Sequence, residues 1–129
     1  MPTKKPKVEE ITCIPVGWLE LAPTPFFLLD HKGRIVWINE SFERLTGYDR
    51  GGIIGARFDR LFSRENIAGM LEDFMKLYKG EGSTDHPYDF LRENGSSLHV
   101  TMDMTPILSE SSQAVRHVFG NIRSHYELD

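Results

Sequence analysis

The alternation of apolar and polar positions along this chain predicts strands at both ends of a domain and helices between them. Two short apolar runs, residues 26–29 and 35–38, flank a tight turn at residues 30–33 and are predicted as the first two strands. Asn39 follows directly and is placed to cap a short helix, which Gly47 ends. This strand, turn, strand and capped helix form the best-defined local pattern in the sequence.

The longest predicted helix begins after Ser63, a candidate N-cap, and ends at Gly80. A single helical turn is predicted just before it, at residues 57–62. The apolar residues of the long helix recur at the spacing i, i+3, i+4, i+7, i+10 and i+11, which is one stripe on a helix. The stripe comprises Ile67, Met70, Leu71, Phe74, Leu77 and Tyr78.

The last third of the chain predicts three strands. A polar connector at residues 81–86 leads to a strand-like run that begins at Tyr88, and Asn94-Gly95 marks a tight hairpin turn. The next strand has the clearest period of two in the chain. Leu98, Val100, Met102 and Met104 point one way, and His99, Thr101, Asp103 and Thr105 point the other. A final strand is predicted at residues 115–122. Strands on both sides of a helical middle indicate an α+β domain with an antiparallel sheet.

Composition and charge restrict the class of protein. A chain of 129 residues with 40% apolar and 26% charged residues is typical of one globular domain. The net charge of −4 gives no electrostatic reason to expect nucleic acid as a partner. Cys13 is the single cysteine, and no apolar run approaches the roughly 20 residues needed to span a bilayer. We therefore expect a cytoplasmic protein with no membrane segment.

The two ends of the chain differ from its middle. Residues 1–10 are polar and charged, and we expect them to form a disordered tail. Residues 11–22 are apolar but interrupted by Pro15 and Gly17, so they are predicted as a short irregular or helical cap segment. Residues 124–129 form a polar exit, which we interpret as a linker toward a downstream module.

Several motifs in the correct order resemble a PAS domain. Residues 26–55 give the order strand, Asp-x-x-Gly turn, strand, Asn, short helix, Gly-Tyr and Ile-Gly that opens such domains. Residues 92–96, Arg-Glu-Asn-Gly-Ser, resemble the family's hairpin turn. Residues 120–123, Gly-Asn-Ile-Arg, stand where many members carry Asp-Ile-Thr, with Asn in place of Asp and Arg in place of Thr. The resemblance covers residues 23–123.

The resemblance implies a five-stranded antiparallel sheet in the order 2-1-5-4-3, with short helices and one longer helix on one face. It also implies a ligand cavity between that face and the long helix. Candidate lining residues are Phe27, Leu29, Ile35, Trp37, Asn39, Ile67, Met70, Phe74, Met102, Met104 and Val118. The alternative is that these side chains fill a core and that Asn39 is only an N-cap. Three methionines fit an adaptable pocket and a collapsed one equally well.

The apolar residues of the cap segment have two possible roles. In the PAS family such caps pack on the outer face of the sheet and often form dimers. The candidates here are Ile14, Val16, Trp18, Leu19 and Leu21. The resemblance therefore implies a homodimer, and the alternative is a segment that packs only on its own domain.

The resemblance also allows cofactor types to be tested. Light-sensing members with covalent flavin photochemistry need a reactive Cys in a Gly-x-Asn-Cys motif. Residues 55–62 read Gly-Ala-Arg-Phe-Asp-Arg-Leu-Phe here, so that photochemistry is excluded. Haem-binding members commonly use a His on the long helix, and residues 63–79 contain none. Haem is therefore not expected, and the identity of any cofactor stays unknown.

The sequence favours a non-enzymatic sensory module for signal transduction, of the kind found in two-component regulation. Such a module would bind a small ligand or a protein partner and relay the change to an output module. One alternative is a ligand-free dimerisation module. Another is a small α+β enzyme with Asp103 or Asp30 as base and Tyr88 as acid. The common catalytic motifs are missing, and Asp103 alternates away from the apolar face.

Overall fold

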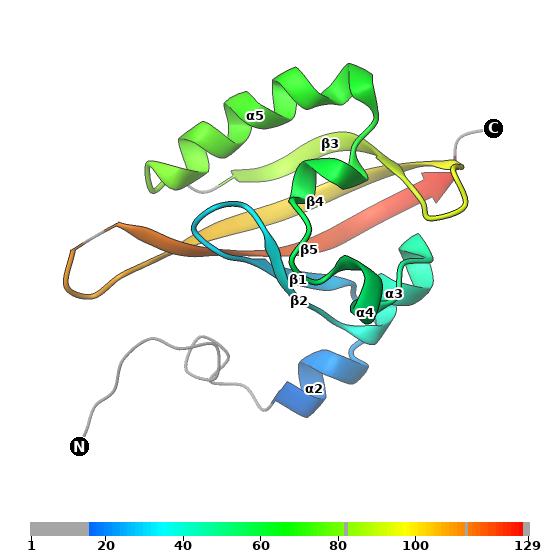
Figure 1. Ribbon diagram of the computed structural model, residues 1–129, viewed down its shortest axis with the longest axis horizontal. Coiled ribbons are helices and arrows are strands. Elements are labelled where there is room, and N and C mark those ends of the chain that lie inside the picture. The colour runs from blue at the N-terminus through cyan, green and yellow to red at the C-terminus, as the bar shows by residue number, and fades with distance from the viewer. Residues whose placement is uncertain (1–15, 82, 113, 128–129) are drawn as a thin grey trace.

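The computed structural model describes residues 16–81, 83–112 and 114–127 (Figure 1). The predictions for residues 1–10 and for Ile14 lie outside this part of the chain. The elements, in chain order, are α2 (Val16–Leu21), β1 (Phe26–Leu29), β2 (Ile35–Ile38), α3 (Glu40–Thr46), α4 (Arg50–Ile53), η1 (Phe58–Leu61, a 3-10 helix), α5 (Arg64–Tyr78), β3 (Ser83–Leu91), β4 (Ser97–Leu108) and β5 (Val115–Glu127).

The strands form one antiparallel sheet of five, in the order β2-β1-β5-β4-β3. This confirms the α+β fold and the predicted strand order. The first strand is therefore an interior strand between β2 and the last strand, and the last strand, β5, lies in the middle of the sheet. The long β4–β5 hairpin joins the two halves of the domain (Figure 1).

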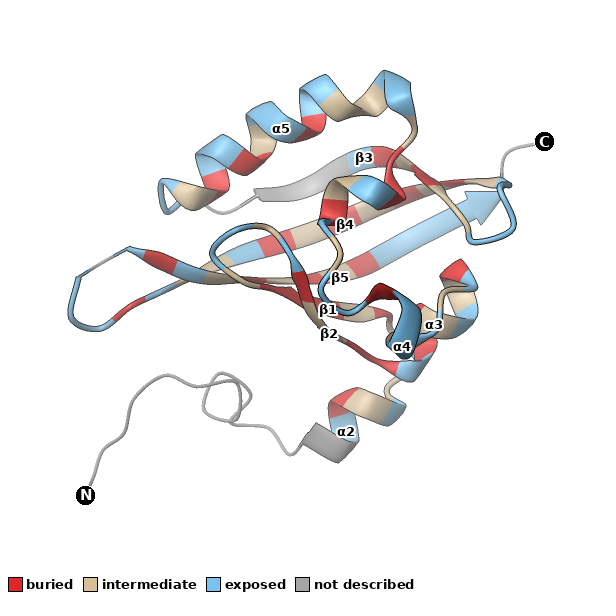
Figure 2. Ribbon diagram, viewed as in Figure 1, coloured by how far each residue is buried: buried red, intermediate tan, exposed pale blue. Residues whose placement is uncertain are grey.

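The helices lie on both sides of the sheet. α5 runs along one side, and the short α2 lies on the other (Figure 1). Met70, Phe74 and Leu77 of α5 are buried against the sheet, as the apolar stripe predicts. Figure 2 shows this side of α5 as buried and the opposite side as exposed. We call the face under α5 the inner face and the opposite face the outer face.

The first hairpin departs from strict alternation at one point. Its register pairs Leu28 with Trp37 and Leu29 with Ile35, so a bulge leaves Val36 as an extra residue in β2. Ile35 therefore joins the inner-face core, whereas Trp37 shares the outer face with Leu28. The prediction that Trp37 lines a cavity beneath the long helix together with Ile35 is wrong for this reason.

Two predicted boundaries also change, and one predicted cap makes no bond. β3 begins at Ser83, inside the predicted connector, because its backbone pairs with Met104 of β4. β5 continues to Glu127, so residues 124–127 of the predicted exit belong to the sheet, although they are exposed (Figure 2). Ser63 stands at the N-cap of α5, but its hydroxyl makes no capping bond.

Phenylalanine rings fill the space between the sheet and the helices. Phe27 stacks on Phe58 with ring centroids 4.6 Å apart and meets the edge of Phe42 at 5.8 Å. Gly120 of β5 leaves room for Phe27, because a Cβ there would lie 2.2 Å from the Phe27 Cζ. A side chain at position 120 and this ring cannot occupy the same space, so the glycine is a packing requirement.

Candidate functional site

Most of the predicted lining residues lie in the core. Those that are buried on the inner face are Phe27, Leu29, Ile35, Met102, Met104 and Val118. Ile67 is partly buried and packs against the same cluster. These positions correspond to the core-filling alternative that the sequence left open. Met70 and Phe74 differ from them, because both also line an open cleft.

The cleft lies between α5, the β1–β2 turn and the start of η1, and we call it the α5 cleft. Its volume is about 250 Å³. Phe58, Met70 and Phe74 are buried and form its floor, whereas Leu71 and Met75 of α5 are exposed at its rim. The remaining lining residues are His31, Lys32, Gly33, Arg57, Asp59 and Tyr78.

Backbone bonds connect the walls of the α5 cleft to one another. The Asp30 carboxylate accepts hydrogen bonds from the Lys32 and Arg34 amides at 2.8 and 2.9 Å, which closes the turn with Gly33 at φ +79°. The Phe58 amide donates to the Gly33 carbonyl at 2.9 Å, so η1 is joined to the same turn. The cleft therefore has two of its walls built on one hydrogen-bonded unit.

Tyr78 closes the third side. Its hydroxyl donates to the Asp30 carbonyl at 2.7 Å and so ties the last turn of α5 to the β1–β2 turn. Burial, followed by the nearby Asp30 carboxylate, raises the pKa of the Tyr78 phenol well above its ordinary value. The phenol is therefore a permanent donor at physiological pH.

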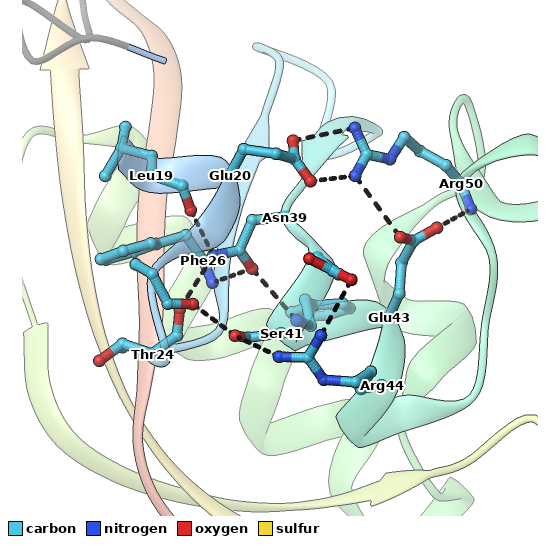
Figure 3. Close-up of polar contacts among 12 residues, drawn as sticks. Leu19, Glu20, Thr24, Phe26, Asn39, Ser41, Glu43, Arg44 and Arg50 are labelled. Atoms are coloured by element: carbon cyan, nitrogen blue, oxygen red, sulfur yellow. Dashed lines mark hydrogen bonds and ion pairs between the residues drawn. The ribbon is translucent and has the colours of Figure 1, made fainter. Parts of the chain in front are cut away.

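A second polar cluster joins α2 to the core, and Figure 3 shows it in detail. Asn39 is fully buried, and its Oδ1 accepts from the Phe42 amide at 3.1 Å as the N-cap of α3 and from the Phe26 amide at 2.9 Å. Its Nδ2 donates to the carbonyls of Leu19 at 2.6 Å and Thr24 at 3.0 Å. Every hydrogen-bonding position of this amide is in use within the protein, so Asn39 is a structural junction between α2, β1 and α3.

Ion pairs and hydroxyl bonds surround this junction. Arg50 at the start of α4 pairs with Glu20 of α2 and, at 3.4 Å, with Glu43 of α3 (Figure 3). The hydrogen bond that the Arg50 guanidinium donates to the Glu20 carboxylate is the largest of the effects that raise the pKa of Arg50. Ser41 donates to the Ala22 carbonyl. The cap segment is thus anchored by polar contacts to two helices of the domain.

The predicted cap residues have different environments. Leu19 is buried, whereas Trp18 and Leu21 are 70% and 74% exposed. Val16 begins α2, but its side chain lies outside the described part of the structure. The outer face near α2 carries the stacked rings of Phe26 and Phe119, 5.3 Å apart. Apolar side chains are therefore exposed on α2 and half-buried on the adjacent sheet.

Two residues of the enzyme alternative, Asp103 and Tyr88, do not converge. Asp103 lies on the outer face and pairs with Arg123 of β5 at 2.6 Å. Tyr88 lies on the inner face, where its ring meets Phe62 and its hydroxyl donates to Asp73. Burial raises the pKa of Tyr88 further above neutrality, and the Asp73 carboxylate adds to the shift. The sheet separates the proposed acid from Asp103, so these two cannot act on one substrate.

Sequence reasoning missed the polar rim of the cleft. The sequence predicts a turn at His31 and Lys32 and a helical turn at Arg57 and Asp59, and no pattern in it links the two segments. The fold brings these two segments together through the Arg34–Arg57 bridge and the Phe58–Gly33 bond. In the described part of the chain, none of the helices is long and apolar enough to cross a membrane.

Comparisons with known proteins agree with this architecture. The family model described as "PAS domain" matches residues 23–123. The PAS domain of a Colwellia psychrerythraea protein shares 19% identity at a TM-score of 0.77, over 88% of this chain and 96% of that one. A domain of a sensory box sensor histidine kinase/response regulator from Geobacter sulfurreducens shares 15% identity at a TM-score of 0.71. The match covers 92% of this chain and 97% of that one.

A light-oxygen-voltage (LOV) protein from Rhodobacter sphaeroides is similar at 21% identity and a TM-score of 0.72, over 87% of this chain and 63% of that one. A search of the curated proteins found no significant match. The sheet order and the family match define an α+β domain of the sensory class. The chain belongs to the PAS domain family.

Proposed function

We propose that this domain is a non-enzymatic sensory module that takes a small ligand in the α5 cleft and relays its binding to an output module. The observation that carries the proposal is the position of Phe58. Its ring lines the cleft and also stacks on Phe27 of β1. A ligand that presses on Phe58 therefore acts on a ring that packs against Gly120 of β5.

The relay continues through the backbone of β1. This strand runs from the cleft turn to Phe26, whose amide donates to Asn39, and Asn39 binds the Leu19 carbonyl of α2. A ligand that favours one packing of these groups would shift the population of docked and released α2. The similarity to a domain of a sensor histidine kinase/response regulator supports a two-component output. We also propose a cytoplasmic setting for the domain.

Native mass spectrometry of the purified protein tests for a ligand. We expect a co-purified small molecule in the wild type and its loss in Leu71→Trp, because the larger ring fills the cleft mouth. Leu108→Trp is the matched control, since Leu108 is 40% exposed, close to the 44% of Leu71, but lies outside the cleft. Ligand binding should also change hydrogen exchange in α2. Ligand retention in Leu71→Trp would argue against the cleft.

A second candidate function is a dimerisation module that acts through the outer face. Trp18 and Leu21 are exposed on α2, beside a sheet face that carries Phe26 and Phe119. Contiguous apolar surface of this kind favours association with another protein surface. We propose a homodimer as the assembly in which this face is covered.

Light scattering coupled to size-exclusion chromatography tests the homodimer. Trp18→Glu should convert a dimer to a monomer, because it places a charge in the proposed interface. Met75→Glu is the control, since Met75 is 61% exposed but lies on α5, on the other side of the sheet. A monomeric wild type, or a dimer that survives Trp18→Glu, would count against this assembly.

A further inference from the structure

We propose that the α5 cleft selects a small amphipathic anion, a medium-chain or aryl carboxylate, over neutral and cationic molecules of the same size. The inference rests on the proposed function and names the chemical class of its ligand. It follows from the combination of an apolar floor with a rim that carries more positive than negative groups.

The floor supplies the apolar half of the site. Phe58, Met70 and Phe74 are almost completely buried, yet each contributes to the cleft surface. Leu71 and Met75 extend this surface outward along α5. A volume of about 250 Å³ is at the small end for ligand sites, so it fits a short chain or a single ring. The two methionines allow the floor to adapt to either shape.

The rim supplies the charge. Lys32 and Arg57 line the cleft with one carboxylate, Asp59, although the whole chain has a net charge of −4. The Asp30 carboxylate is also nearby, but it is not among the lining residues and is bound by the Lys32 and Arg34 amides. Arg57 donates to Asp59 through Nε at 3.2 Å and Nη2 at 2.8 Å, which neutralises that acid. Lys32 makes no ion pair with any described residue, so its ammonium group is the cation left for a ligand.

The neighbouring hydrogen-bond donors are already in use, so a bound anion has few other partners. The Lys32 and Arg34 amides already donate to the Asp30 carboxylate within the turn. The Tyr78 hydroxyl is committed to the Asp30 carbonyl. A bound carboxylate would therefore be recognised by Lys32, with His31 beside it at the rim. The apolar tail would lie over Phe58 and Phe74, whose rings stack on each other with centroids 5.8 Å apart.

Three probes of equal chain length separate the head group from the tail: octanoate, 1-octanol and octylammonium. Titrations followed by amide chemical shifts should place octanoate at Gly33 and along η1. Because an exposed ion pair is weak, the preference for octanoate over octanol should be up to about fivefold. Lys32→Gln should remove most of this preference, and Lys32→Glu should reverse it in favour of octylammonium.

Lys76→Gln is the matched control, because it removes a positive charge from α5 at a position outside the cleft. It should leave the preference unchanged. Equal affinity for octanoate and octanol in the wild type, or an unchanged preference in Lys32→Gln, would overturn the inference. In either case, if octanol still shifts the amide signals of the cleft, the proposal that the cleft binds a ligand would be retained. Shifts that map elsewhere with all three probes would count against both.

Discussion

The ring of Phe27 occupies the space that a side chain at position 120 would need. A Cβ built on Gly120 would lie 2.2 Å from the Phe27 Cζ and 2.6 Å from its Cε1. The two residues face each other in the β1–β5 register, and both are buried. The contact between β1 and β5 is therefore set by one aromatic ring and one missing side chain.

Gly120→Ala should destabilise the domain by about 1–3 kcal/mol, because a well-packed ring must move. Urea denaturation measures the change in the free energy of unfolding. The double variant Phe27→Leu/Gly120→Ala should recover part of the stability that Phe27→Leu loses by itself. Gly69→Ala is the control for the same chemical change, since Gly69 is helical with open space around it. It should stabilise by about 0.5–1 kcal/mol. Equal effects at both glycines would contradict the packing argument.

Asn39→Ala should destabilise the domain by roughly 2–4 kcal/mol, since it removes an N-cap and leaves buried groups without partners. The loss should be accompanied by faster hydrogen exchange in α2, because the Leu19 and Thr24 carbonyls lose their donor. Asn94→Ala, in an exposed turn, should cost about 1 kcal/mol or less. Unchanged exchange in α2 would show that Asn39 does not anchor this helix.

Tyr78→Phe should lower the free energy of unfolding by about 1 kcal/mol, which is at the low end for the loss of a buried hydrogen bond. The Asp30 carbonyl keeps a second donor, the Gly33 amide at 3.1 Å, so it is not left unpaired. We expect faster hydrogen exchange in residues 30–34 as the turn separates from α5. Tyr126→Phe, at an exposed position, is the control and should change neither quantity measurably. Unchanged hydrogen exchange in residues 30–34 of Tyr78→Phe would mean that the phenol does not hold this turn against α5.

His117 should make the domain less stable in mild acid. Burial, helped by Arg116 and His31 and opposed by Asp30, lowers the pKa of His117, so the unfolded chain binds its proton more readily. The free energy of unfolding should therefore fall as the pH drops below the unfolded value of about 6.5, and the loss is complete below the folded pKa.

The His117→Gln variant isolates this effect. Urea denaturation between about pH 7.5 and 5 should show a smaller loss of stability in His117→Gln than in the wild type. His125→Gln, at an exposed position of β5, should follow the wild-type curve. Parallel curves for the wild type and His117→Gln would show that this histidine is not the group responsible.

Local features of this protein could be predicted from the sequence because they depend on neighbouring residues. The turn at residues 30–33 follows from a short acidic side chain and a glycine with positive φ. The Asn39 cap, the apolar stripe of α5 and the alternation in β4 follow from backbone geometry and periodicity. The resemblance to the PAS family then gave the order of the strands.

The candidate site depended on the tertiary structure. A single bulge turned Trp37 to the outer face, and no local pattern in β2 marks an extra residue. The lengths of β3 and β5 were set by pairing with β4 rather than by their own sequences. The cleft combines Lys32, Arg57 and Met75 from three separate segments, and their positions depend on how the turn, η1 and α5 pack. The sequence by itself determined the elements and their periodicity, and only long-range packing decided which side chains meet.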